Sequence, residues 1–290
     1  CFQPANQPMS SQGLDLSQTP SVVARTDNAK AISNMLSSIH LKKDIEAFCV
    51  MDRNGFRFTV QKSNVLQAHV YLKRELFGFF DCEAKQQFGV NLTLLLECLN
   101  IFNTSSNFVA LQISYAGHGR PLLLEMADGG VVSSSGVSTT DNDDPIDFCW
   151  QENPVVNRAI IQSTPLREAL TELDWWGNSL NLFMSPNAPH LQLTSKGQNG
   201  TCEIHFPSSC EAIDEFLCRE DMSTHYRFTL VQCVFKALGL SEKVCIRVNT
   251  AGMLSVQLMI RDDSPITTFV EFLICANVVE EDMQASGQQG

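Results

Sequence analysis

Three aspartates near the middle of the chain, Asp141, Asp143 and Asp144, form the densest group of carboxylates in the sequence. Carboxylates can hold the one or two divalent cations that metal-dependent nucleases use. Such a site needs side chains that converge from rigid elements. These three lie instead in a Ser-rich segment beside Pro145, which is typical of a solvated loop. We therefore expect no catalytic residue and no bound metal there.

Other patterns that could carry chemistry also have simpler interpretations. The glycine-rich segment 117–121 (GHGRP) joins two strand-like runs and precedes no helix, so it predicts a turn and not a phosphate-binding loop. The six histidines never occur at i, i+4 spacing, and the eleven cysteines include no C-x-x-C pair, which disfavours a zinc site or a disulfide scaffold. Unpaired cysteines fit a reducing compartment. We expect no cofactor.

The pair Trp175-Trp176 precedes Gly177 at the predicted end of a helix. A platform on which nucleic-acid bases stack needs basic neighbours, and Asp174 is acidic. We interpret the pair as part of the core.

The composition predicts a folded protein that does not bind nucleic acid strongly by itself. Hydrophobic residues make up 44% of the 290 residues, and this length suits two domains. The chain has 20 Lys and Arg against 32 Asp and Glu, a net charge of −12. Autonomous nucleic-acid binders are usually basic, so a role on DNA has to be local or shared with partners. No apolar run approaches the roughly 20 residues of a membrane helix, and we expect no membrane partner.

The polar segment 133–154 divides the chain into two similar sides, which predicts a duplicated unit and an interdomain connector. Matching residues recur at an offset of 138 positions, among them Phe88 with Tyr226, Val90 with Phe228, and Leu92 with Leu230. We predict a disordered N-terminal extension at 1–20, a first domain at 21–132, the connector at 133–154, a second domain at 155–279 and a disordered tail at 280–290.

Each side is expected to contain two helices and several alternating strands. Apolar residues recur at helical spacing in four segments, at about 27–40, 91–102, 165–174 and 229–239. Asn91, Thr164 and Thr229 are suitable N-cap residues for three of these helices. The fold class that follows is α+β, with two similar domains, each with two helices on mostly antiparallel sheets.

Four segments then carry a resemblance to a known family: 91–102 (NLTLLLECLNIF), 166–174 (LREALTELD), 184–189 (MSPNAP) and 254–261 (LSVQLMIR). Together with the duplicated architecture, they make the chain similar to the sliding clamps, whose replicative member is proliferating-cell nuclear antigen. Within that family the chain resembles more closely the "one" subunits of the nine-one-one DNA-damage checkpoint clamp.

The resemblance implies a nuclear, non-enzymatic subunit of a heterotrimeric ring. Two homologous subunits would complete the ring around double-stranded DNA, a clamp loader would place it at damage sites, and checkpoint and repair proteins would bind through client peptides. The connector would cover a hydrophobic pocket for those peptides. All helices would line the bore, where the DNA-facing candidates are Lys30, Arg167 and Lys236.

The sequence departs from the replicative clamp where that clamp carries lysines, because Glu97 and Asn100 stand there. Glu168 and Glu172 reduce the positive charge of the predicted helix 165–174, which carries Arg167. These departures favour two different partners over a homotrimer.

For subunit joining, the resemblance implies one edge strand from each domain. The matching strands are 108–115, with Val109, Leu111, Ile113 and Tyr115, and 201–206, with Cys202, Ile204 and Phe206. Two alternatives remain: a 3'-5' DNA exonuclease, because members of this subunit family have carried that label, and a homotrimeric replicative processivity clamp. Convergent acidic side chains would favour the exonuclease.

Overall fold

The computed structural model describes residues 20–102, 109–141, 143–260 and 266–277. The predicted disordered segments, apart from residue 20, and Phe108 of the predicted joining strand lie outside these ranges.

The first half of the chain alternates short helices with longer runs of strands. Its elements in chain order are β1 (Val22–Thr26), α1 (Ala29–Ser38), β2 (Glu46–Asp52), β3 (Gly55–Lys62), β4 (Leu66–Lys73), η1 (Arg74–Leu76), β5 (Phe79–Cys82), β6 (Gln86–Asn91), α2 (Leu92–Leu99), β7 (Ala110–Tyr115), β8 (Leu122–Asp128) and β9 (Val131–Val137).

A short strand and a single turn connect this half to the second one. They are β10 (Thr139–Thr140) and η2 (Trp150–Glu152). The second half contains β11 (Val155–Gln162), α3 (Ser163–Asp174), β12 (Ser179–Met184), β13 (Leu191–Gly197), β14 (Gly200–Phe206), β15 (Ile213–Cys218), β16 (Met222–Arg227), α4 (Phe228–Val231), η3 (Gln232–Val234), α5 (Phe235–Leu238), β17 (Ser241–Asn249), β18 (Leu254–Ile260) and β19 (Thr268–Ile274).

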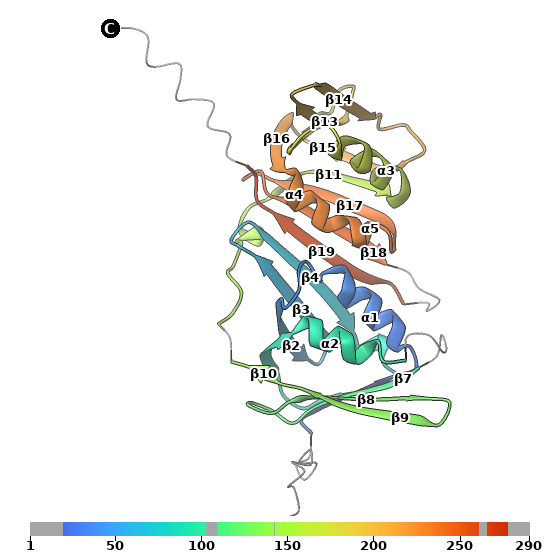
Figure 1. Cartoon of the computed structure of the whole chain (residues 1–290). Coiled ribbons are helices and arrows are strands. Elements are labelled where there is room, and N and C mark those ends of the chain that lie inside the picture. The colour runs from blue at the N-terminus through green and yellow to red at the C-terminus, as the bar shows by residue number, and fades with distance from the viewer. Residues whose placement is uncertain (1–19, 103–108, 142, 261–265, 278–290) are drawn as a thin grey trace, which may run out of the picture.

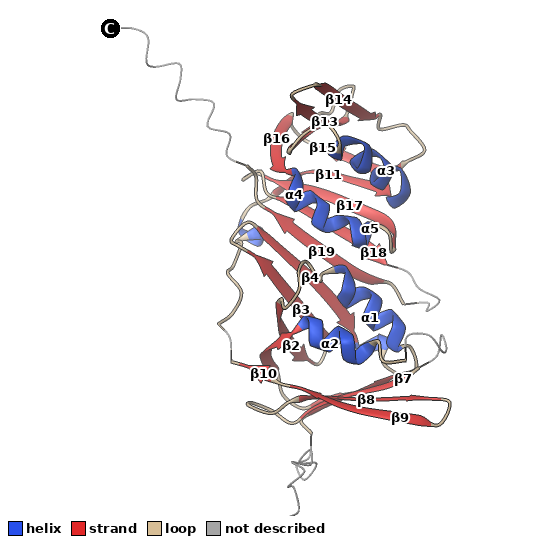
Figure 2. Cartoon of the chain, in the orientation of Figure 1, coloured by secondary structure: helices blue, strands red, loops and turns tan. Residues whose placement is uncertain are grey.

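Both halves follow the same order of elements (Figure 2): one strand, one helix, five strands, a second helix and three strands. In the second half the second helix is a rod in which α4, η3 and α5 follow one another without a break. The predicted α+β class, with two helices in each of two similar units, is confirmed.

The strands in the described part of the chain form three antiparallel sheets. The largest has ten strands in the order β10-β6-β2-β3-β4-β19-β18-β17-β11-β15 and runs through both halves. The halves meet where β4 pairs with β19, from Tyr71 opposite Phe269 to Leu66 opposite Ile274. A five-stranded sheet (β5-β1-β7-β8-β9) and a four-stranded sheet (β14-β13-β12-β16) lie at opposite ends of the molecule (Figure 1).

The helices lie on one face of the ten-stranded sheet (Figure 1). Each helix is amphipathic. In α1, the side chains of Ile32, Met35 and Leu36 are buried at helical spacing. Burial of each of these side chains contributes about 1.5–3 kcal/mol to the free energy of folding, relative to leaving it exposed. The predicted N-cap Asn91 is confirmed, because its side chain accepts a hydrogen bond from the Leu94 amide of α2.

The predictions of Thr164 and Thr229 as N-caps are wrong. Helix α3 begins at Ser163 and α4 at Phe228, so both threonines lie inside the first turn. The preceding residues, Gln162 and Arg227, make no capping side-chain bond.

The connector is shorter than the sequence indicates, because the segment after position 132 continues a sheet. Strand β9 pairs with β8 as far as Val137, opposite Leu122, and Thr139 and Thr140 pair with β6. The Ser-rich run 133–135 is typical of a linker, yet it lies in the edge strand β9, where its serines are alternately half-buried and exposed.

Among the described residues, no helix is both long and apolar enough to span a membrane.

Candidate nucleic-acid interface and joining edges

The three predicted DNA-facing cations are exposed on helices of the same face. Lys30 lies on α1, Arg167 on α3 and Lys236 on α5. Arg167 and Lys236 come together, because a guanidinium nitrogen of Arg167 lies 3.7 Å from the position that a Cβ on Gly239 would take, at the end of α5. Partial burial lowers the pKa of the Lys236 ammonium.

Sequence reasoning missed three further cations near the helices. Lys42 and Lys43 are exposed in the loop between α1 and β2, where the adjacent Asp44 amide donates to the Thr93 hydroxyl of α2. Lys62, at the end of β3, contacts the Cys233 sulfur of η3 at 3.8 Å. The adjacent lysines after α1 are visible in the sequence and could have indicated a basic site near the helices. Nothing in the sequence around Lys62 indicates that its side chain reaches a helix in the other half.

The helix face also carries carboxylates, as the sequence suggested. Glu97 on α2 and Glu168 and Glu172 on α3 are exposed. Asn100, which stands where the replicative clamp carries a lysine, accepts a 2.7 Å hydrogen bond from the Ser33 hydroxyl and so links α2 to α1. The resulting face has mixed charge, which permits only weak contact with phosphates.

Strand β14 is an edge strand, as predicted for its segment. It pairs only with β13 in the described part of the chain. Cys202, Ile204 and Phe206 alternate with the exposed residues Thr201, Glu203 and His205. Its backbone groups on the side away from β13 are therefore open to another strand.

The prediction of a second joining edge at 108–115 is wrong. Strand β7 lies between β1 and β8, so its hydrogen bonds are used on both sides. The four residues proposed there are buried, none more than 5% exposed: Val109, Leu111, Ile113 and Tyr115.

The five-stranded sheet at that end of the molecule has two edges among the described strands: β9, which pairs only with β8, and β5, which pairs only with β1. Val131 and Val132 at the start of β9 are 61% and 67% exposed. Figure 1 shows β9 and β14 at the two opposite ends of the molecule. An exposed edge strand with apolar side chains is a template for pairing with another chain.

The connector crosses the face of the ten-stranded sheet that the helices leave uncovered. Gln67 donates a side-chain hydrogen bond to the Ile146 carbonyl, and the Ile146 amide donates to the Gln61 side chain. Trp150 lies 5.6 Å from the guanidinium of Arg247 on β17, a cation–π contact. The connector is thus attached to both halves.

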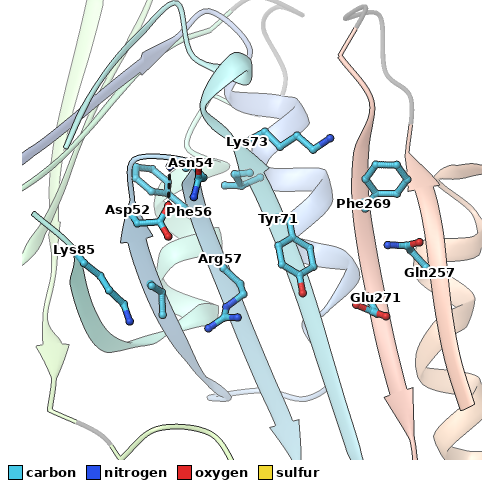
Figure 3. Close-up of a pocket in the computed structure, with 13 residues that line it drawn as sticks. Asp52, Asn54, Phe56, Arg57, Tyr71, Lys73, Lys85, Gln257, Phe269 and Glu271 are labelled. Carbon is cyan, nitrogen blue, oxygen red and sulfur yellow. Dashed lines mark hydrogen bonds between the residues drawn. The ribbon is translucent and has the colours of Figure 1, made fainter. Parts of the chain in front are cut away.

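A hollow of about 390 Å³ lies between the connector and this sheet face, and an adjoining one of about 500 Å³ lies at the junction of the halves. Figure 3 shows Arg57, Tyr71 and Glu271 reaching from β3, β4 and β19 into the second hollow. Phe56 and Phe269 add apolar walls. The resemblance implied a hydrophobic pocket, and the walls found here are mixed.

His69, which lines the smaller hollow, is neutral at physiological pH. Burial, aided by the charge of Arg57, lowers its pKa from 6.5 to about 4, and its Nδ1 lies 3.0 Å from the Thr59 hydroxyl. Tyr71 has a raised pKa, mainly because it is partly buried.

We expect His69 to make the protein less stable as the pH falls from 6.5 to about 4, the interval between its ordinary and its lowered pKa. In that interval the unfolded chain binds a proton that the folded chain excludes, which lowers the free energy of unfolding by about 3 kcal/mol. Urea unfolding at pH 7 and pH 4 measures this loss. His69→Gln should lose correspondingly less, and an equal loss in both proteins would contradict the assignment.

The group of aspartates singled out in the sequence, Asp141, Asp143 and Asp144, forms no convergent site in the described part of the chain. Asp141 pairs with His118 at 3.0 Å on the surface, and Asp144 lines the smaller hollow. Across the described ranges, no three His, Cys, Asp or Glu side chains are grouped so that they could hold a metal ion.

The interpretation of both tryptophans after α3 as core is wrong. Trp175 is 85% exposed and Trp176 is 37% exposed. Trp176 packs against the β13–β14 hairpin, where its ring lies 3.2 Å from the position of a Cβ on Gly200. Trp175 follows α3 on the outer surface.

Comparisons with known proteins agree with this architecture. The family model for the repair protein Rad1/Rec1/Rad17 matches residues 21–260. The cell cycle checkpoint protein RAD1 of Homo sapiens is 35% identical over 259 residues, and that of Mus musculus 34% over 258; each alignment covers 88% of this chain and 91% of the relative. The DNA repair exonuclease REC1 of Mycosarcoma maydis is 26% identical over 55% of this chain and 41% of its own length. This chain belongs to the Rad1 family of repair proteins.

Proposed function

We propose that this chain is one of three unlike subunits of a ring that encircles double-stranded DNA at sites of damage and promotes checkpoint signalling and repair. The observation that carries the proposal is the pair of open strand edges, β9 and β14, at opposite ends of a molecule whose helices share one face. The names of the relatives, cell cycle checkpoint protein RAD1, support the checkpoint role.

Each joint of the ring would form between β9 of one subunit and the counterpart of β14 in the next. Such pairing satisfies backbone groups that the edges leave open, and it would bury Val131 and Val132. Because every subunit offers one edge of each kind, the joints follow one another around a closed ring.

The helix face would line the bore and contact DNA through Lys30, Arg167 and Lys236, with help from Lys42 and Lys43. A closed ring stays on DNA by topology, so weak and sequence-independent contacts with phosphates are sufficient. This is compatible with a chain whose net charge is −12.

The hollows beneath the connector are our candidates for the binding of client peptides from checkpoint and repair proteins. Arg57, Lys85 and Glu271 supply polar contacts there, and Phe56 and Phe269 supply apolar ones. A clamp loader would open and close the ring, and the site of action would be the nucleus.

The experiment that tests the proposal is the solution mass of the protein, alone and with the two other clamp subunits of the same species. We expect a monomer of 32.2 kDa alone and a one-to-one-to-one complex with both partners. A stable homotrimer would instead indicate a replicative processivity clamp, and a chain that bound neither partner would overturn the proposal.

We infer that the chain acts by binding and not by catalysis, and the name of the REC1 relative makes this worth testing directly. Incubation of the purified protein with 3'-labelled duplex DNA and Mg²⁺ or Mn²⁺ should release no nucleotides above a buffer control. Release that copurified with the protein would support an exonuclease.

The bore assignment predicts the salt dependence of DNA binding by the assembled ring. Each of Lys30→Ala, Arg167→Ala and Lys236→Ala should reduce the slope of log K against log salt by about one, because each removes one phosphate contact. Lys85→Ala is the matched control, since Lys85 is an exposed lysine beside the hollows on the opposite sheet face. Equal slopes in all four variants would contradict the assignment.

A further inference from the structure

The outer stripe of α3 combines two carboxylates with an indole. Helix α3 buries Leu166, Ala169, Leu170 and Leu173 against the sheets. On the opposite side, Glu168, Glu172 and Trp175 follow one another at i, i+4 and i+7, so they share one exposed face. Neither glutamate has an ion-pair partner in the described part of the chain.

This stripe lies beside the joining edge. Helix α3 contacts β13 and β14, and Trp176 holds its end against the hairpin that connects these two strands. A chain that paired with β14 would therefore approach the outer side of α3. The indole of Trp175 is 85% exposed. Covering it with another chain would remove a large apolar area from water, and tryptophan is enriched at interfaces for this reason.

The fold indicates which element of the neighbouring subunit would lie beside this stripe at the proposed β14 joint. In this chain α2 lies beside the other joining edge and contacts β9. Because the subunits of the proposed ring share one architecture, the neighbour's counterpart of α2 would lie next to this chain's α3 at the joint. Carboxylates and an indole attract Lys or Arg, by charge and by cation–π contact.

The α2 helix of a second copy of this chain carries no Lys or Arg. Its α2 and the turn that follows present Leu94, Glu97 and Ile101 to solvent, with Leu94 48% and Ile101 55% exposed. Self-pairing would place Glu97 opposite Glu168 and Glu172, and like charges that meet at an interface oppose binding. Phosphates of DNA would be repelled by the same glutamates.

We propose that the Glu168–Glu172–Trp175 stripe receives a helix bearing Lys or Arg from an unlike clamp subunit, and that it selects this neighbour over a second copy of the chain. The proposal rests on the ring described above and names the partner chemistry at its β14 joint.

The test compares variants in pairwise binding to each of the two other clamp subunits at 0.15 M salt. Glu168→Lys with Glu172→Lys should raise the dissociation constant for one subunit at least tenfold and leave the other unchanged. Glu75→Lys with Glu83→Lys is the matched control, because both are exposed glutamates outside α3 and β14 and the charge change is the same. Thermal unfolding confirms that the variants fold.

Tryptophan emission supplies an independent readout. We expect a blue shift when the wild-type chain binds that subunit, and its loss in Trp175→Phe. If the charge-reversed variant bound as tightly as wild type and the wild-type emission did not change on assembly, the proposed role of the stripe would be wrong. The proposed ring would not be affected by that result. Failure of the wild-type chain to bind either subunit would overturn the ring itself.

Discussion

Val132→Glu should raise the dissociation constant for the neighbour at the β9 joint by about a hundredfold, which corresponds to about 3 kcal/mol. Val132 is 67% exposed in the isolated chain, so the substitution should not unfold the monomer. In the ring the same position would be covered, and a carboxylate there would lose its hydration without gaining a partner. Sedimentation or calorimetry with each partner separately measures the effect.

Leu217→Glu is the control for this experiment. Leu217 is 46% exposed on β15, at an edge of the ten-stranded sheet that takes no part in the proposed joints. We expect the Leu217 variant to bind both partners normally. If both variants assembled like wild type, β9 would not be a joining edge.

Gly197→Ala should lower the free energy of unfolding by about 3 kcal/mol, which is large for the addition of one methyl group. A Cβ at Gly197 would lie 1.7 Å from the carbonyl oxygen of Trp176, and one at Gly177 would lie 2.3 Å from that of Lys196. The end of α3 thus meets the β13–β14 hairpin backbone to backbone, and no flexible side chain can move aside. Urea unfolding measures the loss.

Gly78→Ala is the matched substitution, since a Cβ there would have no heavy atom within 4 Å and its backbone φ is not in the left-handed region. Its stability should stay within about 0.5 kcal/mol of wild type. Equal stability of the two variants would show that the α3 end can shift freely. The Gly197 variant should also bind the β14 neighbour less tightly, because it displaces Trp176.

The sequence predicted the element types well, because periodicity and capping are local. The apolar spacing in α1 and the Asn91 cap of α2 were sufficient to locate both helices. The caps at Thr164 and Thr229 failed because the strands before α3 and α4 lead directly into the first helical turn.

The joining edges were only half predictable, because an edge depends on which strands pair. Val109 to Tyr115 alternate like any half-buried strand, and only the placement of β1 and β8 on either side excludes them. The edge strand that we propose as the joint, β9, contains the run Ser133-Ser134-Ser135, which is typical of a loop. Similarly, Trp175 is apolar, and only the direction in which α3 ends places it in solvent.

Because β4 pairs with β19, we expect the two halves of the subunit to move together as one rigid body. The two halves share one hydrogen-bonded sheet across their junction, and the connector is attached to both. Bending at the junction would break backbone hydrogen bonds, whereas parting one joint of the proposed ring releases only the contacts between two chains. If the proposed ring is opened by a loader to admit DNA, we expect it to part at a single joint, with each subunit moving as a rigid body that carries the displacement around the ring.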